Sequence, residues 1–193
     1  DEYHYEIEGL DLGGGLGIAY VAEEEPPTIE SFAKLTCTAV KELCAQYGVK
    51  EPRIAVEPGR SIAATPGVTL YTVGILKTLP GIRNIVATDN IRTALYGADY
   101  EPVIANKAGQ PRTKVVTLVG KHCESGDAVA ANASIQNPDL GDIVCMFGTG
   151  AYCHSMSSRY NGQPRPGIVF VKDGQARLVT RRETYADLMS CDL

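Results

Sequence analysis

The sequence predicts an α/β segment followed by an all-β domain, and three observations favour this order. Two short apolar segments, residues 10–12 and 54–56, flank a helical pattern at residues 29–47. Both segments run into glycine turns, and strand, turn, helix, strand and turn in succession are typical of an α/β repeat with parallel strands. Beyond residue 67, the apolar segments become rich in β-forming residues. We therefore place a domain boundary near residue 67.

The helix at residues 29–47 has signals at both ends. Pro26 and Pro27 precede Thr28, a suitable N-cap, and Gly48 is a suitable C-cap. Between the two caps, apolar residues recur at helical spacing. They are Phe32, Leu35, Cys37, Ala39, Val40, Leu43 and Cys44.

Residues 68–193 are predicted to form the β domain. Its candidate strands are residues 69–76, 115–119, 143–147, 168–171 and 176–179. The last two strands flank a Lys-Asp-Gly-Gln turn, which predicts a β-hairpin. By contrast, the α/β part at residues 1–67 is too short to close a barrel of about 250 residues or a doubly wound sheet. We therefore expect it to be the end of a larger domain whose upstream part is absent from this chain.

The composition excludes several classes of protein. The chain has 193 residues, of which 44% are apolar and 21% are charged, as in ordinary soluble globular proteins. Its net charge of -5 argues against nucleic acid as a partner. No apolar run approaches the length of a membrane helix, about 18 residues. The six cysteines are scattered without CxxC or zinc-ligand spacing, which indicates reduced thiols, a cytoplasmic location and no metal site.

Two glycine-containing turns suggest a binding site. Gly13, Gly14 and Gly15 follow the first strand directly. Glycines there let backbone N–H groups approach an oxyanion, typically a phosphate, although a tight turn without a ligand is an equal alternative. A second turn, Glu57-Pro58-Gly59-Arg60, follows the next strand. Because loops after the last two strands of a parallel barrel commonly build a phosphate site, the pair of turns favours binding.

Glu57 and Arg60 have two interpretations. They could form a surface ion pair, the usual outcome for such neighbours. Alternatively, Glu57 holds a cationic ring nitrogen and Arg60 binds an anion such as a carboxylate. Composition alone does not choose between these two.

Three further groups of polar residues are candidates. Arg92 and Tyr96, four residues apart, would share one face of a helix that is either solvated or ligand-binding. Cys123 follows His122 and is either a small buried hydrophobe or a thiol active in proton transfer. Tyr152 follows a glycine turn and is either a packed aromatic or one more hydrogen-bond donor to a phosphate.

The chain resembles the diaminopimelate decarboxylases in six segments, which occur in the family's order: GGGLGI, EPGRSI, DNIRTALYGADY, GKHCESGD, GTGAYCHSMSSRYNG and RRETYADL. The resemblance runs from about Leu10 to Leu188. The family shares its fold type with alanine racemase and the eukaryotic ornithine decarboxylases. The resemblance therefore implies the C-terminal part of a TIM (β/α)8 barrel that binds pyridoxal 5'-phosphate, followed by a Greek-key-like β domain. It also implies decarboxylation of meso-diaminopimelate to L-lysine and carbon dioxide, by a homodimer with shared active sites.

The resemblance assigns one group of residues to the cofactor. Gly13, Gly14 and Gly15 would contact the cofactor phosphate. Gly59 would add a further phosphate contact. Glu57 would hold the pyridinium nitrogen and keep it protonated.

A second group is assigned to the substrate. Arg60 would bind a substrate carboxylate, and Arg92 and Tyr96 would bind the substrate too. Tyr152 would lie beside the phosphate or the substrate.

Cys123 and Glu124 would reach into the active site of the other subunit. The resemblance places Cys123 near the carbanion and Glu124 at the distal amino group of the substrate. Decarboxylases of simple diamino acids generally have an aspartate directly after this cysteine, so Glu124 favours diaminopimelate as the substrate.

Two features depart from the family pattern. None of the eight lysines lies in the Tyr-Ala-x-Lys context of the family's cofactor-bonding lysine, so this chain alone is not expected to bond the cofactor. In addition, Ala87 and Thr88 are adjacent where the family usually has an intervening Asp-Gly-Gly run. Two alternatives stay open. One is a sister decarboxylase of ornithine, arginine or a carboxylated polyamine, and the other is a non-catalytic interaction protein derived from a decarboxylase.

Overall fold

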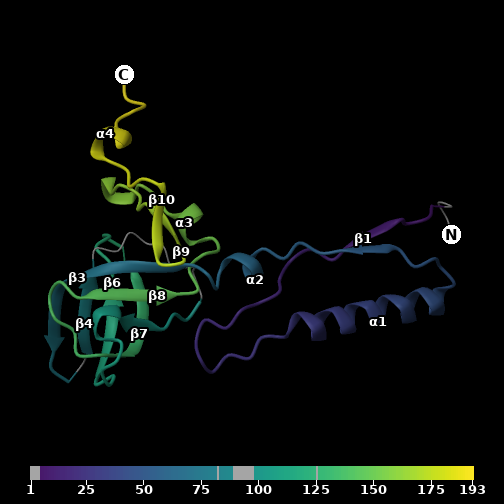
Figure 1. Ribbon diagram of the computed structural model, residues 1–193, viewed down its shortest axis with the longest axis horizontal. Coiled ribbons are helices and arrows are strands. Elements are labelled where there is room, and N and C mark those ends of the chain that lie inside the picture. Colours follow the sequence, from purple (N-terminus) through teal and green to yellow (C-terminus); the bar gives the residue numbers. More distant parts are fainter. Residues whose placement is uncertain (1–4, 82, 89–97, 125) are drawn as a thin grey trace.

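The computed structural model describes residues 5–81, 83–88, 98–124 and 126–193. The molecule is elongated: an N-terminal arm extends from a larger, β-rich body, and the C-terminal segment rises from the same body (Figure 1). None of the helices in the described part of the chain has both the length and the apolar character that crossing a membrane requires.

The arm is a βαβ unit. Strand β1 (Gly9–Asp11) pairs in parallel with β2 (Arg53–Ala55), and helix α1 (Ile29–Tyr47) connects them. Thr28 Oγ1 accepts a hydrogen bond of 3.1 Å from a backbone N–H in the first helical turn. Gly48 ends the helix with a left-handed φ of 64°. The predicted helix is therefore confirmed with both of its caps, and each strand begins one residue earlier than predicted.

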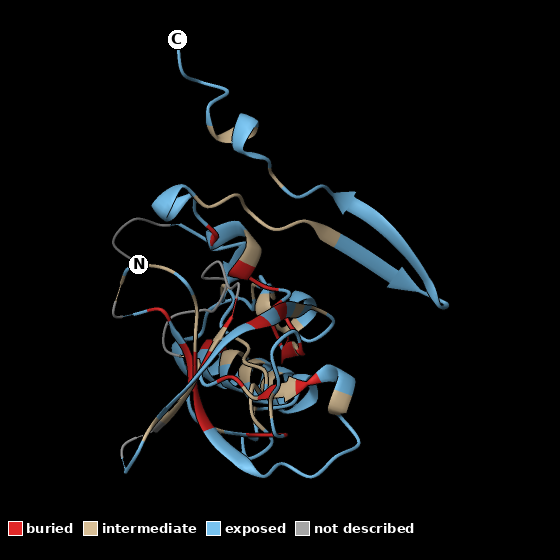
Figure 2. Ribbon diagram, turned by 90° about the vertical axis from the view of Figure 1, so that its left-hand side faces the viewer, coloured by how far each residue is buried: buried red, intermediate tan, exposed pale blue. Residues whose placement is uncertain are grey.

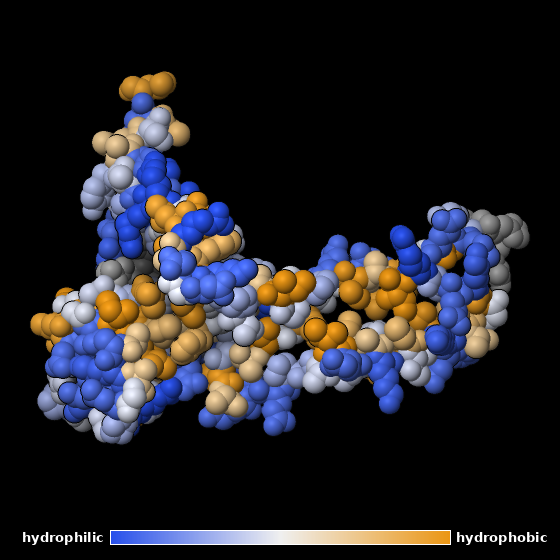
Figure 3. Space-filling view, viewed as in Figure 1, coloured by the Kyte–Doolittle hydropathy of each residue, from blue (hydrophilic) through white to orange (hydrophobic). Residues whose placement is uncertain are grey.

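Apolar side chains are exposed along the arm, where Figure 3 shows them over much of its length. In α1 the exposed apolar residues are Ile29, Leu35, Leu43 and Tyr47. Only Cys44 is buried among the residues of this helix. A helix in a folded domain normally buries one apolar stripe against its neighbours, so this helix has the pattern of an element that packs within a larger domain.

The body contains a six-stranded sheet. Its strands are β3 (Val68–Leu79), β4 (Arg83–Thr88), β5 (Pro102–Ile104), β6 (Lys114–Val119), β7 (Ala128–Ile135) and β8 (Ile143–Phe147). Their order across the sheet is β5-β8-β3-β4-β6-β7. Neighbours are antiparallel except for the parallel pair β4 and β6, so the sheet is mixed. The strands predicted at residues 69–76, 115–119 and 143–147 are confirmed.

Strand β3 serves both halves of this sheet. Its residues from Val68 to Thr72 pair with β8, and those from Val73 onward pair with β4. The two edge strands approach each other, because β5 also packs beside β7. There, the backbone N–H of Ile104 donates to Oε1 of Gln136 at 2.9 Å. The sheet is therefore nearly closed on itself.

The core lies inside this curved sheet, where the buried residues gather in Figure 2. All six strands contribute side chains to it. Burying one aliphatic side chain of this size contributes about 1.5–3 kcal/mol relative to its exposure. The most enclosed members include Val73, Val86, Ile104, Leu118, Ile135, Val144 and Met146.

Short helical turns interrupt the all-β pattern that the sequence predicts for the body. They are α2 (Arg60–Ala63), η1 (Ala105–Lys107), α3 (Cys153–Met156) and η2 (Tyr160–Gly162). Helix α2 lies where the arm meets the body (Figure 1). The predicted sequence of an α/β segment and a mainly β segment is confirmed in outline.

The predicted hairpin is formed by β9 (Ile168–Lys172) and β10 (Gln175–Thr180). Asp173 and Gly174 have positive φ values of 50° and 72°, as a type I′ turn requires. The hairpin stands away from the core, and every residue of β10 is exposed (Figure 2).

Glu183 ties the C-terminal segment to the loop before this hairpin. Its Oε1 pairs with Arg159 Nη2 at 3.1 Å and with Arg165 Nη2 at 2.7 Å. Hydrogen bonds from Arg165 and then Arg159 lower the pKa of Glu183 from 4.5 to about 2. After it, Thr184 caps helix α4 (Tyr185–Leu188).

Candidate active site

The two turns predicted to form a binding site pack against each other. The backbone N–H of Glu57 donates to the O atom of Gly13 at 2.7 Å. The N–H of Gly13 in turn donates to Oδ1 of Asp11 at 2.8 Å, which fixes the start of the glycine loop. A Cβ atom on Gly14 would lie 2.7 Å from the O atom of Glu57. Any larger residue at position 14 would therefore push the turns apart.

The glycine loop fits a phosphate group. Gly13 and Gly15 have left-handed φ values of 69° and 92°, and open space lies beside both of their Cα atoms. Within the described part of the chain, no protein acceptor takes the N–H groups of Gly14 and Gly15. Successive unpaired N–H groups on such a loop are a suitable set of donors for an anion.

Arg60 does not pair with Glu57, because none of the ion pairs among the described residues joins them. Its guanidinium carbon lies 5.4 Å from the ring centroid of Tyr152 and 5.9 Å from that of Tyr20. Both distances suit a cation–π interaction. The structure therefore favours the interpretation that leaves Glu57 and Arg60 free to bind a ligand.

Tyr152 is placed beside Arg60 in an unusual backbone conformation. Its φ of 65° and ψ of −50° are rare for a residue with a side chain, and such strain costs about 1–3 kcal/mol. The N–H of Met156, in α3, donates to the O atom of Tyr152 at 2.8 Å. Surrounding backbone contacts therefore keep Tyr152 in a conformation that an unconstrained chain would rarely adopt.

Backbone hydrogen bonds join the turn after β8 to the residues that follow α2. The N–H of Gly150 donates to the O atom of Ala64, and that of Thr149 to the O atom of Gly67, both at 3.0 Å. A Cβ on Gly150 would overlap the O atom of Ala63, and a Cβ on Gly67 would overlap the backbone of Gly150. This close junction fixes α2, and with it Arg60, against the body.

Tyr20 is a site residue that the sequence analysis missed. Besides its contact with Arg60, its ring packs edge-to-face on Tyr100, with centroids 5.2 Å apart. Burial raises the pKa of Tyr20 above its ordinary value of 10.0, although Arg60 opposes this shift. The only signal in the sequence was an aromatic residue shortly after Gly17, which a packed core residue would also give.

Asp127 closes the loop that carries Cys123 and Glu124. Its Oδ2 accepts a hydrogen bond of 2.7 Å from the N–H of His122. Its backbone O accepts one of 2.9 Å from Gly120, and a Cβ on Gly120 would overlap the carboxylate. Cys123 is exposed, so the interpretation of this residue as a small buried hydrophobe is wrong for this structure.

The ring of His122 points inward, with 2% of the side chain exposed. It packs edge-to-face on Tyr160 at a centroid distance of 5.6 Å. The Tyr160 hydroxyl donates to the backbone O of Cys123 at 3.3 Å. These contacts join the loop to η2 rather than to the cluster of Arg60, Tyr20 and Tyr152.

The structure thus divides the predicted site residues into three groups. The first group comes together at the junction of arm and body: Gly13, Gly14, Gly15, Glu57, Gly59, Arg60 and Tyr152. The second consists of Cys123 and Glu124 on their own loop. Arg92 and Tyr96 lie outside the described residues. In the part of the chain that the structure describes, no group of three or more His, Cys, Asp or Glu side chains could hold a metal ion.

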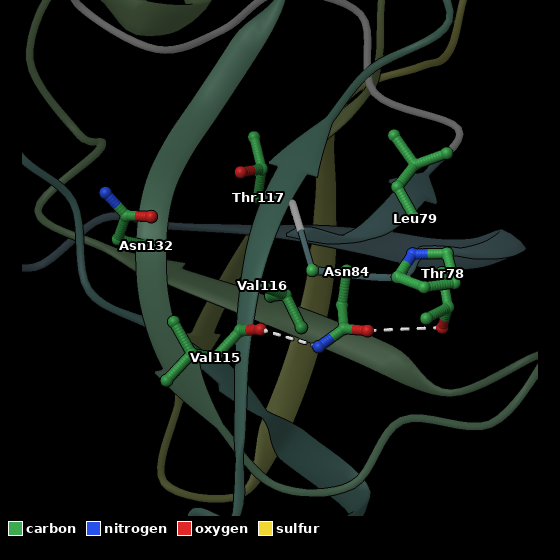
Figure 4. A pocket seen from close by; sticks show the side chains of 9 residues that line it. Thr78, Leu79, Asn84, Val115, Val116, Thr117 and Asn132 are labelled. Carbon is green, nitrogen blue, oxygen red and sulfur yellow. Dashed lines mark hydrogen bonds between the residues drawn. The ribbon is translucent and has the colours of Figure 1, made fainter.

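A pocket of about 340 Å³ lies elsewhere, between the β3–β4 turn and strands β6 and β7 (Figure 4). Asn84 crosses it, donating from Nδ2 to the O atom of Val115 at 3.2 Å and accepting from Thr78 at 3.1 Å. Its lining is Thr78, Leu79, Pro80, Gly81, Asn84, Val115, Val116, Thr117 and Asn132. None of these carries a charge or belongs to the candidate site, so this pocket is separate from the site.

Comparison with known families gives the site its context. The sequence profile described as "Pyridoxal-dependent decarboxylase, pyridoxal binding domain" matches residues 1–64. The profile described as "Pyridoxal-dependent decarboxylase, C-terminal sheet domain" matches residues 82–150. The chain belongs to the pyridoxal-dependent decarboxylases. Arg60 and Tyr20 lie within the first matched segment, and Tyr152 lies two residues beyond the second.

Within this family, the chain is similar to diaminopimelate decarboxylases. It is 44% identical to that of Bacillus subtilis (strain 168) over 198 residues, which cover 100% of this chain and 45% of the relative. The M. jannaschii diaminopimelate decarboxylase in complex with L-lysine matches with a TM-score of 0.85 and 33% identity, covering 100% of this chain and 44% of that one. The Helicobacter pylori enzyme complexed with L-lysine has a TM-score of 0.79 and 28% identity, covering 95% and 44%. The chain thus spans about half the length of the relatives it matches, and corresponds to their C-terminal half.

Proposed function

We propose that the protein is a diaminopimelate decarboxylase, which uses pyridoxal 5'-phosphate to convert meso-diaminopimelate to L-lysine and carbon dioxide. The packing of the glycine loop on the Glu57–Arg60 turn carries this proposal, because it combines donors for a phosphate with a carboxylate and a guanidinium. Identity of 44% over the whole chain to an enzyme of this name supports the choice within the family.

The fold proposed for the whole protein is a TIM (β/α)8 barrel followed by a Greek-key-like β domain, with the boundary near residue 67. The parallel pair β1 and β2, joined by α1, has the geometry of consecutive barrel strands. The exposed apolar residues of α1 support packing of the arm within such a barrel. In a barrel, both glycine-containing turns would lie at the carboxyl ends of the strands, where active sites form.

The cofactor would be held by backbone and side-chain groups of the arm. The N–H groups of Gly14, Gly15 and Gly59 would bind its phosphate, and Gly13 would contact it from the same loop. Glu57 is exposed at the same place and would keep a proton on the ring nitrogen. When bound, pyridoxal phosphate delocalises the charge that develops at the α-carbon of the substrate.

Substrate binding falls to the cationic and phenolic groups around this position. Arg60 would bind a substrate carboxylate, with Tyr152 beside it next to the phosphate or the substrate. Arg92 and Tyr96 would complete the site, on the family pattern alone. The complexes of two related enzymes with L-lysine support a site shaped for this product.

The second group of residues would act in a partner subunit. Cys123 is exposed on a loop whose contacts among the described residues include Tyr160; this exposure supports a homodimer with shared active sites. Cys123 would then stand near the reacting carbon and exchange a proton there. Glu124 would bind the distal ammonium group of diaminopimelate. The proposed location is the cytoplasm, where the six free cysteines would stay reduced.

The test is an assay of the full-length protein with pyridoxal phosphate. Carbon dioxide release is measured with meso-diaminopimelate, L-ornithine and L-arginine at equal concentrations. We expect release from diaminopimelate with stoichiometric L-lysine, and at least about a hundredfold lower kcat/KM for the other two, because they lack the distal carboxylate. Preferred use of ornithine or arginine would indicate a sister decarboxylase. No release from any substrate, with folded protein, would indicate a non-catalytic relative.

A further inference from the structure

The guanidinium of Arg60 lies against two tyrosine rings that come from opposite sides of the junction. Tyr20 belongs to the segment after the glycine loop, and Tyr152 follows β8 in the body. We propose that Tyr20 is a positioning residue that holds Arg60 in place for the substrate carboxylate. The inference rests on the proposed function, in which Arg60 binds that carboxylate.

Tyr20 is itself fixed by the body, although it belongs to the N-terminal half of the chain. Its ring packs edge-to-face on Tyr100, and it lies against the buried core of the sheet. A Cβ on Gly148 would come within 3.2 Å of its Cδ1 atom, so the glycine there leaves just enough room for the ring. On the other side, the N–H of Tyr20 donates to Oε2 of Glu24 at 2.6 Å.

The aromatic ring, rather than the hydroxyl, performs the positioning. The hydroxyl oxygen of Tyr20 is buried and has no hydrogen-bond partner among the described residues. A sealed hydroxyl cannot reach a ligand, whereas the face of the ring attracts a cation through its quadrupole. Tyr152 offers a second ring to the same guanidinium, so Arg60 is held from two sides.

Holding Arg60 in advance matters because its side chain is long. A free arginine side chain loses up to about 2 kcal/mol of rotamer entropy when it is fixed. If the two rings fix it before the substrate arrives, that loss does not weaken substrate binding. Removal of the Tyr20 ring should therefore raise KM for the substrate more than it lowers kcat.

The test compares variants of the full-length protein with bound cofactor. Tyr20→Leu removes the ring face, and we expect KM for meso-diaminopimelate to rise about three- to tenfold, with kcat changed less than twofold. Tyr20→Phe restores the ring and should restore KM. In an Arg60→Lys background, Tyr20→Leu should add little, because a lysine lacks the flat guanidinium that stacks on both rings. Val116→Ala, a core change in β6 distant in sequence from both tyrosines, controls for lost stability and should leave KM unchanged.

Two further measurements test the proposal in case Tyr20→Leu does not fold. Replacing Tyr20 by a ring-fluorinated phenylalanine keeps its shape but weakens the quadrupole, and KM should again rise relative to Tyr20→Phe. In parallel, the Arg60 Nε–H resonance should be shifted by the ring currents of the tyrosines, and should move in Tyr20→Leu whether or not the enzyme is active. Wild-type KM in both Tyr20→Leu and the fluorinated variant, or an unshifted resonance, would overturn the inference. Absence of activity in the wild type with a shifted Arg60 resonance would instead reject only the proposed function.

Discussion

The candidate site residues with the most constrained conformations are those whose neighbouring contacts allow only one position. Tyr152 keeps a φ of 65° because the Gly150 contact with Ala64 lies before it and helix α3 begins directly after it. Arg60 lies between two rings for a similar reason. At this scale the candidate site is distinguished by the constrained conformations of Tyr152 and Arg60 rather than by unusual residue types.

Glu124 gives a prediction at the same scale. Glu124→Gln removes the charge proposed to bind the distal ammonium group, and a hydrogen bond to a charged group contributes about 1.5–3 kcal/mol. We therefore expect kcat/KM for meso-diaminopimelate to fall about 10- to 100-fold in the full-length enzyme. Steady-state kinetics with Glu101→Gln as the control, at a surface ion pair with Arg112, measure the effect. Equal kinetics in both variants would remove Glu124 from the site.

Sequence reasoning found the residues of the junction but could not see what holds them. The order of strand, glycine turn, strand and Glu57–Arg60 turn is enough to place Glu57 and Arg60 at one edge of a parallel pair. The contact of Arg60 with Tyr20 and Tyr152 depends on how two distant segments pack, which no local spacing encodes. For the same reason, a thiol next to His122 did not reveal that the His122 ring packs on Tyr160.

At the scale of elements, strands with strong local preference were predictable and the others were not. Residues 143–147 were predicted with the observed bounds, because this run is rich in Ile, Val and Phe. Strand β7 was missed, since its sequence AVAANASI contains four alanines and resembles a helix or loop by propensity. It is a strand because it pairs with β6 and buries Val129 and Ile135 in the core, which is a tertiary effect.

The junction of arm and body also gives a prediction about an element. Gly150→Ala would place a Cβ onto the O atom of Ala63, and both partners are backbone atoms that cannot turn aside. We expect a loss of about 2–3 kcal/mol, as for other overpacked sites, seen as a thermal midpoint lower by about 5 °C or more. Gly109→Ala is the matched control, because nothing lies within 4 Å of its new Cβ. Similar midpoints for the two variants would contradict the close junction.

At the scale of the whole molecule, the arm and the body each carry part of the candidate site, and in the described part of the chain they meet at the Gly67–Gly150 junction. The arm supplies the glycine loop and Arg60, and the body supplies Tyr152 and the Cys123 loop. Apolar residues exposed on α1 mark the surface that packs on further protein in our proposal. Sequence patterns predicted the division into two parts, whereas the near-closure of the sheet by β5 and β7 depends on long-range packing.

The attachment of the C-terminal segment gives a prediction for the response of the molecule to pH. The pKa of Glu183 lies at about 2, below its ordinary value of 4.5, because Arg165 and Arg159 stabilise the carboxylate. Its contribution to stability is therefore complete above pH 4.5 and is lost as the pH falls towards 2. In Glu183→Gln, the thermal midpoint should be lower near neutral pH and should fall less between those two pH values.

The control for this measurement is Glu51→Gln, since Glu51 is exposed and makes no ion pair among the described residues. Its midpoint should follow the wild type across the whole pH range. If the thermal midpoints of Glu183→Gln and the wild type changed with pH in parallel, the ion pairs of Glu183 with Arg159 and Arg165 would contribute nothing to stability.

The backbone junction at Gly67 and Gly150 also bears on how this protein could be altered. Because main-chain atoms form the junction, it does not depend on the identity of exposed side chains on the Cys123–Glu124 loop. The Cys123–Glu124 loop is fastened independently through Tyr160 and Asp127. If the proposed roles hold, exchanges in the Cys123–Glu124 loop should change selection of the distal group of the substrate while Arg60 keeps its position, so the two specificities could be altered separately.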